Sequence, residues 1–329
     1  MHPPEAATVP RQAADHALAF IESAVDSPNG MLSRIAFDPS FTDTVALADA
    51  RAVIEAEFGA DIGFDLTDDL SAPILGLPLL PWEERELVEH FGRSIGQGTT
   101  GHRVRLFVDG TVFPADTDCT AVAAQALHDT NLISDAELVR FAEELLSAAS
   151  DGVVMVYWPN GGRGRKFDPV AAANALCVLK EARRRGMSEG DDVIAATGKY
   201  VSEHLESGAY LAGSRYYPSP DAFLQVVSRL AERFDDLRQA LEKPLAEAII
   251  AREDDSWVLD VALRAIAADN IGLEEGQRQR RKLLIESQEA DGSWPAAPYY
   301  KLGRFPVYFG SRVLTTLFAA NALRRLERS

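Results

Sequence analysis

The sequence is poor in several features that mark large classes of protein. It contains only two cysteines, Cys119 and Cys177, which are too few for a scaffold held by disulfides. It has no run of 18 apolar residues, so we expect no helix that spans a membrane. Basic residues number 33 against 50 acidic ones, and the resulting net charge of −17 argues against nucleic acid as a partner.

The first ten residues lack both the basic and the apolar segment of a secretory signal peptide, which leads us to expect a cytoplasmic protein. We expect residues 1–10 to be disordered and residues 11–329 to form one domain. Strand patterns are scarce as well. Apart from a short candidate at 104–108, the sequence predicts no sheet.

Helical periodicity, in contrast, runs through the chain in twelve segments. Six with one charged face begin near residues 12, 82, 134, 188, 235 and 273; six alanine-rich and apolar ones begin near 42, 116, 168, 221, 257 and 310. A helix that is apolar most of the way round is buried, and an amphipathic one faces water. The alternation therefore predicts an all-α fold, an (α/α)6 toroid of six outer and six inner helices, with 71–80 as a packed loop.

A repeat supports this architecture. The nine-residue block Cys119–Leu127 aligns with Asp168–Leu176 and with Thr315–Leu323, and each block ends in Gln or Asn, Ala and Leu. The first offset is 49 residues and the second is 147, three times 49. A fixed period near 50 indicates stacked helix pairs, although chance similarity among alanine-rich helices is the alternative.

The start of one expected inner helix gathers two carboxylates, a thiol and a hydroxyl: Asp116, Asp118, Cys119 and Thr120. Pro114 and the polar residues ahead of an apolar run predict a helix N-terminus here. Free backbone N–H groups and the positive end of the helix dipole then face the carboxylates. The simpler interpretation is an N-cap, which needs one aspartate and contributes about 1 kcal/mol.

Inner helices of a toroid run roughly parallel, so the loops that precede them meet at one rim. We expect an aromatic-lined cavity there, able to stabilise a cation through π-faces, although the rings could instead plug the toroid. The predicted substrate-binding residues are Phe113, Tyr157, Trp158, Asp168, Trp257, Tyr300, Tyr308 and Phe309. The same loops carry basic residues that could hold a diphosphate or carboxylate tail or simply be solvated: Arg163, Arg165, Lys166, Lys301 and Arg304.

Two motifs resemble those of the class II terpene cyclases, the clan of the squalene and oxidosqualene cyclases. Asp118-Cys119-Thr120-Ala121 is similar to the Asp-Cys-Thr-Ala motif of oxidosqualene cyclases. Together with Asp116 it is similar to the Asp-x-Asp-Asp-Thr-Ala motif of squalene–hopene and bacterial diterpene cyclases, with Cys119 in place of the last Asp. A second motif resembles their fold-marking repeat: the basic and aliphatic run 281–285, then Gln288, Gly292 and Trp294.

The resemblance implies that Asp118 is a general acid that protonates an isoprenoid alkene or epoxide, with Cys119 as its hydrogen-bond partner and Asp116 and Thr120 tuning it. It implies proton-initiated cyclisation or rearrangement of a small isoprenoid or prenylated substrate. No redox cofactor or metal is expected, and Mg²⁺ enters only if the substrate is a diphosphate. Family members place the cavity between two toroids, whereas this chain has helices for one. Its cavity should be smaller, or shared across a homodimer or with a partner protein.

Three alternatives stay open at this point. A binding or scaffold protein could keep the toroid without the chemistry. Protein prenyltransferases share the toroid but bind zinc, and here His128 falls at the far end of the helix that carries Cys119. Toroidal glycosidases use two carboxylates, for which Asp116 with Asp168 or Asp260 would serve, although no motif supports the pair.

Overall fold

The computed structural model describes residues 5–27, 29–59, 61–62, 66, 68–109, 113–252 and 257–326. Thirteen α-helices lie within these ranges. Their bounds are α1 Glu5–Val25, α2 Leu47–Phe58, α3 Ser71–Gly76, α4 Arg85–Gln97, α5 Thr117–Asp129, α6 Asp135–Leu146, α7 Pro169–Arg184, α8 Asp191–Glu206, α9 Pro220–Arg233, α10 Asp235–Ile250, α11 Val258–Ile271, α12 Gln277–Glu286 and α13 Arg312–Leu326.

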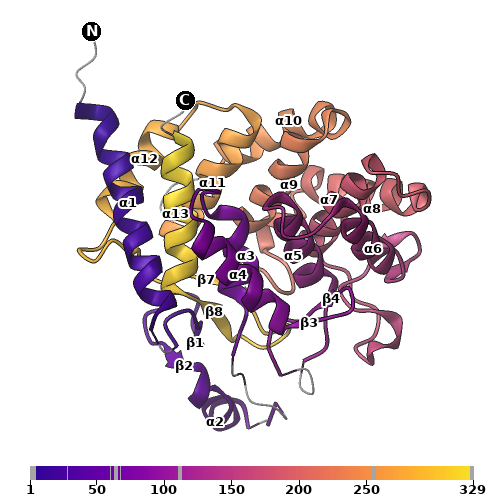
Figure 1. Ribbon diagram of the computed structural model, residues 1–329, viewed down its shortest axis with the longest axis horizontal. Helices are drawn as coiled ribbons and strands as arrows, with labels where there is room; N and C mark the ends of the chain where they lie inside the picture. Colours follow the sequence, from indigo (N-terminus) through magenta and orange to yellow (C-terminus); the bar gives the residue numbers. More distant parts are fainter. Residues whose placement is uncertain are drawn as a thin grey trace.

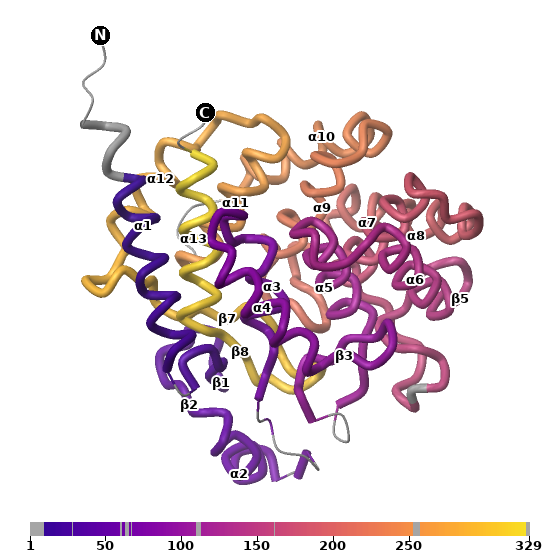
Figure 2. The backbone as a smooth tube through the Cα atoms, in the orientation of Figure 1, coloured from indigo at the N-terminus to yellow at the C-terminus, as the bar shows by residue number. Residues whose placement is uncertain are grey.

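Six helices form a closed inner ring. Helix α3 packs on α5, and contacts continue through α7, α9 and α11 to α13, which returns to α3. Helices α1, α4, α6, α8, α10 and α12 pack outside this ring, and α1 and α13 lie side by side in both views (Figures 1 and 2). The predicted all-α toroid of six inner and six outer helices is confirmed. None of the described helices combines the length and apolar character that a membrane crossing requires.

Residue size explains which helices are inside. The alanines of the repeat are buried, as in the run Ala171–Ala173 of α7, and small side chains let neighbouring helices approach closely. Outer helices bury only one stripe; in α6 this consists of Leu138, Phe141, Ala142 and Leu145, at helical spacing. The alternation seen in the sequence is thus the difference between a helix packed all round and one packed on one side.

The first inner helix is not the one predicted. Segment 42–58 was expected inside, but α2 begins at Leu47 and packs on strands β1 (Arg34–Ala36) and β2 (Val45–Ala46). It lies at the bottom of Figure 1, apart from the ring. The inner position belongs to α3 and the 3₁₀ turn Leu77–Leu79, which we expected to be a loop. A Cβ on Gly76 would lie 2.5 Å from Leu317 Cδ1, so the glycine allows α3 to approach α13.

The structure also contains small sheets where none was predicted. Strands β2 Val45–Ala46, β1 Arg34–Ala36, β8 Tyr308–Gly310 and β7 Pro298–Lys301 form an antiparallel sheet in that order. Two hairpins pair β3 Thr99–Thr100 with β4 Arg103–Val104, and β5 Ala149–Ser150 with β6 Val153–Val154. Only the start of the candidate strand at 104–108 is a strand. At the N-terminus α1 begins at Glu5, so residues 5–10, expected to be disordered, are helical, and 1–4 lie outside the described residues.

The Gln…Gly-x-Trp motif ties α12 to its neighbours. Gln288 Nε2 donates to the carbonyl oxygens of Ala13 at 2.8 Å and Gly292 at 2.9 Å. The fully buried Trp294 donates its indole N–H to the Leu284 carbonyl at 2.8 Å. The motif therefore joins the end of one outer helix to α1 and to the turn that follows, the fold-marking role that the resemblance implied.

Candidate active site

The N-terminus of α5 is fixed in place by its own residues. Asp116 is the N-cap, and its Oδ1 accepts the backbone N–H of Cys119 at 2.7 Å. Thr117 donates its backbone N–H to the Val156 carbonyl at 2.9 Å and its hydroxyl to the Met155 carbonyl at 2.7 Å. Capping and these loop contacts hold the first turn rigidly, so the side chain of the next residue, Asp118, has a defined direction.

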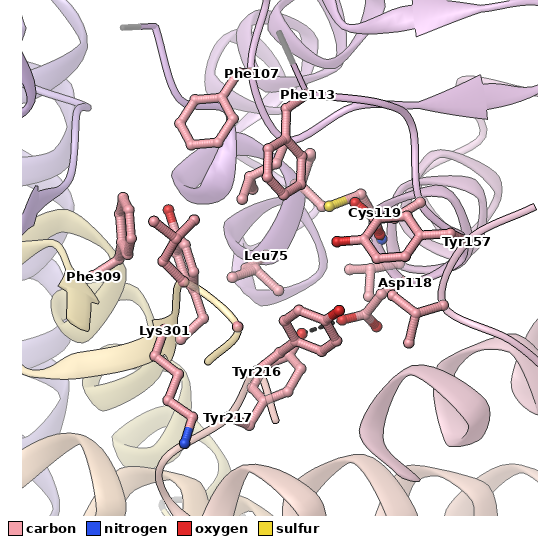
Figure 3. Close-up of a pocket in the computed structure, with 18 residues that line it drawn as sticks. Leu75, Phe107, Phe113, Asp118, Cys119, Tyr157, Tyr216, Tyr217, Lys301 and Phe309 are labelled. Atoms are coloured by element: carbon pink, nitrogen blue, oxygen red, sulfur yellow. Dashed lines mark hydrogen bonds between the residues drawn. The ribbon is translucent and has the colours of Figure 1, made fainter. Parts of the chain in front are cut away.

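Asp118 contacts two neutral hydrogen-bond donors. Its Oδ1 accepts from Asn174 Nδ2 of α7 at 2.7 Å, and its Oδ2 accepts from the Tyr217 hydroxyl, the contact drawn as a dashed line in Figure 3. Arg229 of α9 donates in turn to Asn174 Oδ1. Neutral donors stabilise the carboxylate that remains after proton loss, without the full charge that would keep the acid ionised.

Burial makes both aspartates weak acids. Burial raises the pKa of Asp118 to about 6, while the hydrogen bonds from Tyr217 and Asn174 lower it. Burial and then the charge of Asp118 raise the pKa of Asp116 to about 7. Two carboxyl groups so close titrate as a coupled pair, and the pair holds a proton near neutral pH.

A cavity of about 730 Å³, which includes some space open to solvent, lies against this turn. The loops before α7, α9 and α13 meet there as expected, joined by α3 and by the turn before α5. Figure 3 shows Asp118 on one side of the cavity and Phe309 on the other. The lining comprises Ile74, Leu75, Leu106, Phe107, Phe113, Asp116, Asp118, Cys119, Val122, Val156, Tyr157, Tyr216, Tyr217, Tyr300, Lys301, Leu302, Gly303 and Phe309.

Aromatic rings make up much of the cavity wall. Phe113 lies edge-on to Tyr157, with centroids 6.4 Å apart, and Tyr157 lies edge-on to Tyr216 at 6.3 Å. On the far side Tyr300 stacks on Phe309 at 4.7 Å. Four of the predicted substrate-binding residues, Phe113, Tyr157, Tyr300 and Phe309, therefore lie on its wall.

A basic vestibule adjoins the cavity and shares Phe113, Tyr157 and Tyr216 with it. We use this name for the hollow whose cationic lining residues are Arg163, Lys166, Arg215 and Arg304. Arg163 lies 4.9 Å above the Phe113 ring, and Lys166 lies 5.5 Å from the Tyr157 ring. Lys301 lines the cavity itself.

Three of the aromatic residues predicted to bind substrate, Trp158, Trp257 and Tyr308, do not line the cavity. The indole N–H of Trp158 donates to the Glu144 carbonyl at 3.1 Å, and its ring lies under Arg103. Trp257 is the N-cap residue of α11, and Tyr308 lies in β8 opposite Ala36. Arg165 forms an ion pair with Asp151 and does not line the vestibule, unlike Arg163 and Arg304.

The polar residues predicted for the site also differ in whether they line the cavity. Asp168 does not line the cavity but caps α7 by accepting the backbone N–H of Val170 at 3.0 Å. Thr120 Oγ1 accepts the backbone N–H of Val104 at 2.9 Å and so holds a loop. Cys119 lines the cavity, but its backbone N–H bonds to Asp116, whereas it was expected to be the partner of Asp118.

Sequence reasoning did not assign the actual partners of the acid, Asn174 and Tyr217. Asn174 was visible as the polar residue that ends the repeat block, and Tyr217 as one ring among several in the loop before α9. Nothing in the sequence singled out Arg229, whose contact with Asn174 depends on how α9 packs on α7.

The geometry does not favour the two other toroidal chemistries. Within the described ranges, no three side chains of His, Cys, Asp or Glu come together as ligands for a metal ion. His128 lies in the last turn of α5, at the end opposite Cys119, and bonds to Asp135 at 2.8 Å. Asp260 accepts from the Ser219 hydroxyl at 2.5 Å and, like Asp168, does not line the cavity with Asp116.

Comparison with known proteins identifies the fold. No protein-family model matches the chain. A drimenol cyclase from Aspergillus calidoustus is 30% identical over 215 residues, 64% of this chain and 38% of that protein, so the chain spans well under half of this relative.

Solved structures match more of the chain. Two structures of the type II terpene cyclase MstE from Scytonema, one in complex with its substrate geranylgeranyl dihydroxybenzoate, give TM-scores of 0.65 and 0.62 at 11% identity. They cover 98% and 96% of this chain, and 98% of each solved chain. ent-Copalyl diphosphate synthase from Streptomyces platensis gives 0.59 at 15% identity, over 84% of this chain and 54% of that one. The chain has the toroid fold of the type II terpene cyclases, as its motifs predicted.

Proposed function

We propose that the chain is a terpene cyclase-like enzyme that starts a cyclisation or rearrangement by proton transfer from Asp118 to a small isoprenoid or prenylated substrate. The observation that carries the proposal is one buried carboxyl group, held by two neutral donors, on the wall of a cavity lined mainly by aliphatic and aromatic groups. Alkene or epoxide protonation needs an undissociated acid in a dry site, and this environment favours the protonated form.

In the first step the O–H bond of Asp118 breaks, and the π electrons of the alkene, or a lone pair of the epoxide oxygen, take the proton. The hydrogen bonds from Asn174 and Tyr217 then stabilise the carboxylate that forms. The cation moves along the folded substrate, where the faces of Phe113 and Tyr157 stabilise positive charge and keep water away. Asp116 acts through its coupling to Asp118.

The basic vestibule suits a substrate with an anionic head group. Four cationic side chains line it, and its one carboxylate, Asp61, is already paired with Arg51 at 2.8 Å. Two of the similar proteins act on or make anionic compounds by name, a dihydroxybenzoate and a diphosphate. We expect a diphosphate or carboxylate at the vestibule with the isoprenoid chain in the cavity. Mg²⁺ would accompany the substrate only if it is a diphosphate.

In this proposal a single toroid suffices. A solved type II terpene cyclase chain of equal extent supports the same view. We propose one toroid domain for residues 11–329. A cytoplasmic location and a homodimer stay predictions.

The test is to incubate the purified protein with farnesyl and geranylgeranyl diphosphates, epoxidised prenyl chains and prenylated dihydroxybenzoates, and to analyse the products by mass spectrometry. We expect an isomer or cyclised product from at least one, and none with Asp118→Asn. The scaffold alternative predicts tight binding with no product from any member, and equal binding by Asp118→Asn.

A further inference from the structure

A second polar group lies in the cavity, on the side away from the acid. Tyr300 of β7 lines the cavity and stacks on Phe309, whereas Asp118 lies on the other side (Figure 3). Its hydroxyl is buried and makes no hydrogen bond of ordinary geometry. A buried hydroxyl without a partner is costly, so its presence in an apolar wall calls for a role.

Behind Tyr300 is a chain of polar groups. The hydroxyls of Ser33 and Ser71 are 3.0 Å apart, and the Ser71 hydroxyl also donates to Asp69 Oδ1. Asp69 is 3% exposed and accepts the backbone N–H groups of Ser33 at 2.8 Å and Ser71 at 2.7 Å. Burial and the charge of Asp69 raise the pKa of Tyr300 well above its usual range, and the nearby Ser33 and Ser71 side chains lower it. The Tyr300 hydroxyl is therefore neutral.

These polar groups extend to the side of the cavity wall that faces away from the cavity. Ser33 also lines a separate polar groove between α1, β1 and the start of α13, together with Ser27, Arg34 and Ser311. The groove contains about 1190 Å³ of space, which includes open solvent. A proton that reaches Asp69 thus has hydroxyl groups leading to water outside the cavity.

We propose that Tyr300 is the base that ends the reaction and that Ser71, Ser33 and Asp69 relay its proton out of the cavity. A C–H bond next to the cationic carbon breaks, its electrons form a C=C bond, and the proton goes to the Tyr300 oxygen. The tyrosine proton passes to a serine hydroxyl, and the serine proton to the Asp69 carboxylate. One proton leaves Asp118 and one arrives at Asp69, so the substrate is isomerised without net gain or loss. The inference rests on the proposed function of Asp118.

The test uses a substrate turned over by the unaltered protein and compares its products. In Tyr300→Phe the cation still forms, so substrate should still be consumed, and the change should show in the products. The ratio of the main alkene to water-captured alcohols and alkene isomers should fall on the order of tenfold or more, as for loss of a general base. Ser71→Ala, which keeps the backbone bond to Asp69, should shift the ratio in the same direction.

The matched control is Tyr210→Phe. Tyr210 is also buried and stacks on a phenylalanine, Phe223 at 5.5 Å, but it does not line the cavity. Unchanged product ratios in both Tyr300→Phe and Ser71→Ala would overturn the relay, as would an equal shift in Tyr210→Phe. Loss of consumption as complete as in Asp118→Asn would assign Tyr300 to initiation instead. Full turnover by Asp118→Asn would instead reject the proposed function itself.

Discussion

Helices α5 and α9 each place an aspartate at their second residue, and the two positions differ in what surrounds them. Asp118 of α5 is held by an amide and a phenol. Asp221 of α9, which is 0% exposed, accepts two hydrogen bonds from Arg252 at 2.8 and 3.0 Å, and the buried Arg264 lies 3.5 Å away. Burial raises the pKa of both carboxyl groups, but at Asp221 the charges of Arg264 and Arg252 oppose the rise, whereas at Asp118 the main opposition comes from neutral hydrogen bonds. Repeated positions of one fold therefore yield a structural ion pair in one place and an acid in another.

Exchanging each aspartate for asparagine should separate the two roles and give the largest effects. Asp118→Asn should lower turnover on the order of 10²–10⁴-fold, the range for a general acid, with the fold retained. Asp221→Asn should lower the free energy of unfolding by about 3–5 kcal/mol, because it leaves Arg264 buried beside a neutral group. Denaturant unfolding and steady-state rates on both variants measure this. An equal loss of stability in the two variants would mean that Asp118 and Asp221 have the same structural role.

The partners of Asp118 should control the pH range of activity. The protonated acid is the active form, so activity should be full at low pH and fall as the pH rises through the pKa of about 6. Asn174→Ala removes a hydrogen bond that lowers this pKa, so the falling limb should move to higher pH while maximal turnover drops.

Gln125→Ala is the control for that pH profile. Gln125 ends the same repeat block in α5 as Asn174 does in α7, but its amide donates to Asp129 at 2.8 Å. In Gln125→Ala the falling limb of the pH profile should stay at the same pH as in the unaltered protein. A limb that does not move in Asn174→Ala would mean that another group sets the profile.

The smallest effect should come from the vestibule, through two arginines of one loop. Arg163 lines the vestibule, whereas Arg165 is paired with Asp151. With an anionic substrate, Arg163→Gln should raise KM on the order of tenfold, the size of one charged hydrogen bond, with little change in kcat. Arg165→Gln should leave KM unchanged. Equal KM values for the two variants would place the head group elsewhere.

Much of the fold followed from local pattern. Alanine-rich and amphipathic segments alternate because inner helices touch neighbours all round and outer helices on one side only. The composition of each segment is therefore enough to tell the two kinds apart. Helix α3 was not predicted because Pro73 and Gly76 are residues that usually interrupt a helix. Pro73 lies in the first turn, where its missing N–H costs nothing, and Gly76 serves close packing. The sheet was missed because β1 and β8 are three residues each and pair across most of the chain.

The sequence predicted the acid motif within one segment, and several of the rings that the rim loops bring to the cavity wall. Asp116, Asp118 and Cys119 share one helical turn, so spacing alone located them. Asn174 and Tyr217 reach Asp118 from α7 and the loop before α9, and such contacts depend on packing that no local pattern encodes. The position of Trp158 depends on packing in the same way, since its indole N–H donates to the Glu144 carbonyl of α6.

The most direct test of the central claim is the origin of the first proton, measured in D₂O with a substrate that has no epoxide, so that the proton is taken up by an alkene carbon. If Asp118 exchanges with solvent and protonates the substrate, each product molecule should carry one non-exchangeable deuterium, and Asp118→Asn should yield no labelled product. Product that forms at the normal rate without deuterium would contradict an acid-initiated reaction at this site.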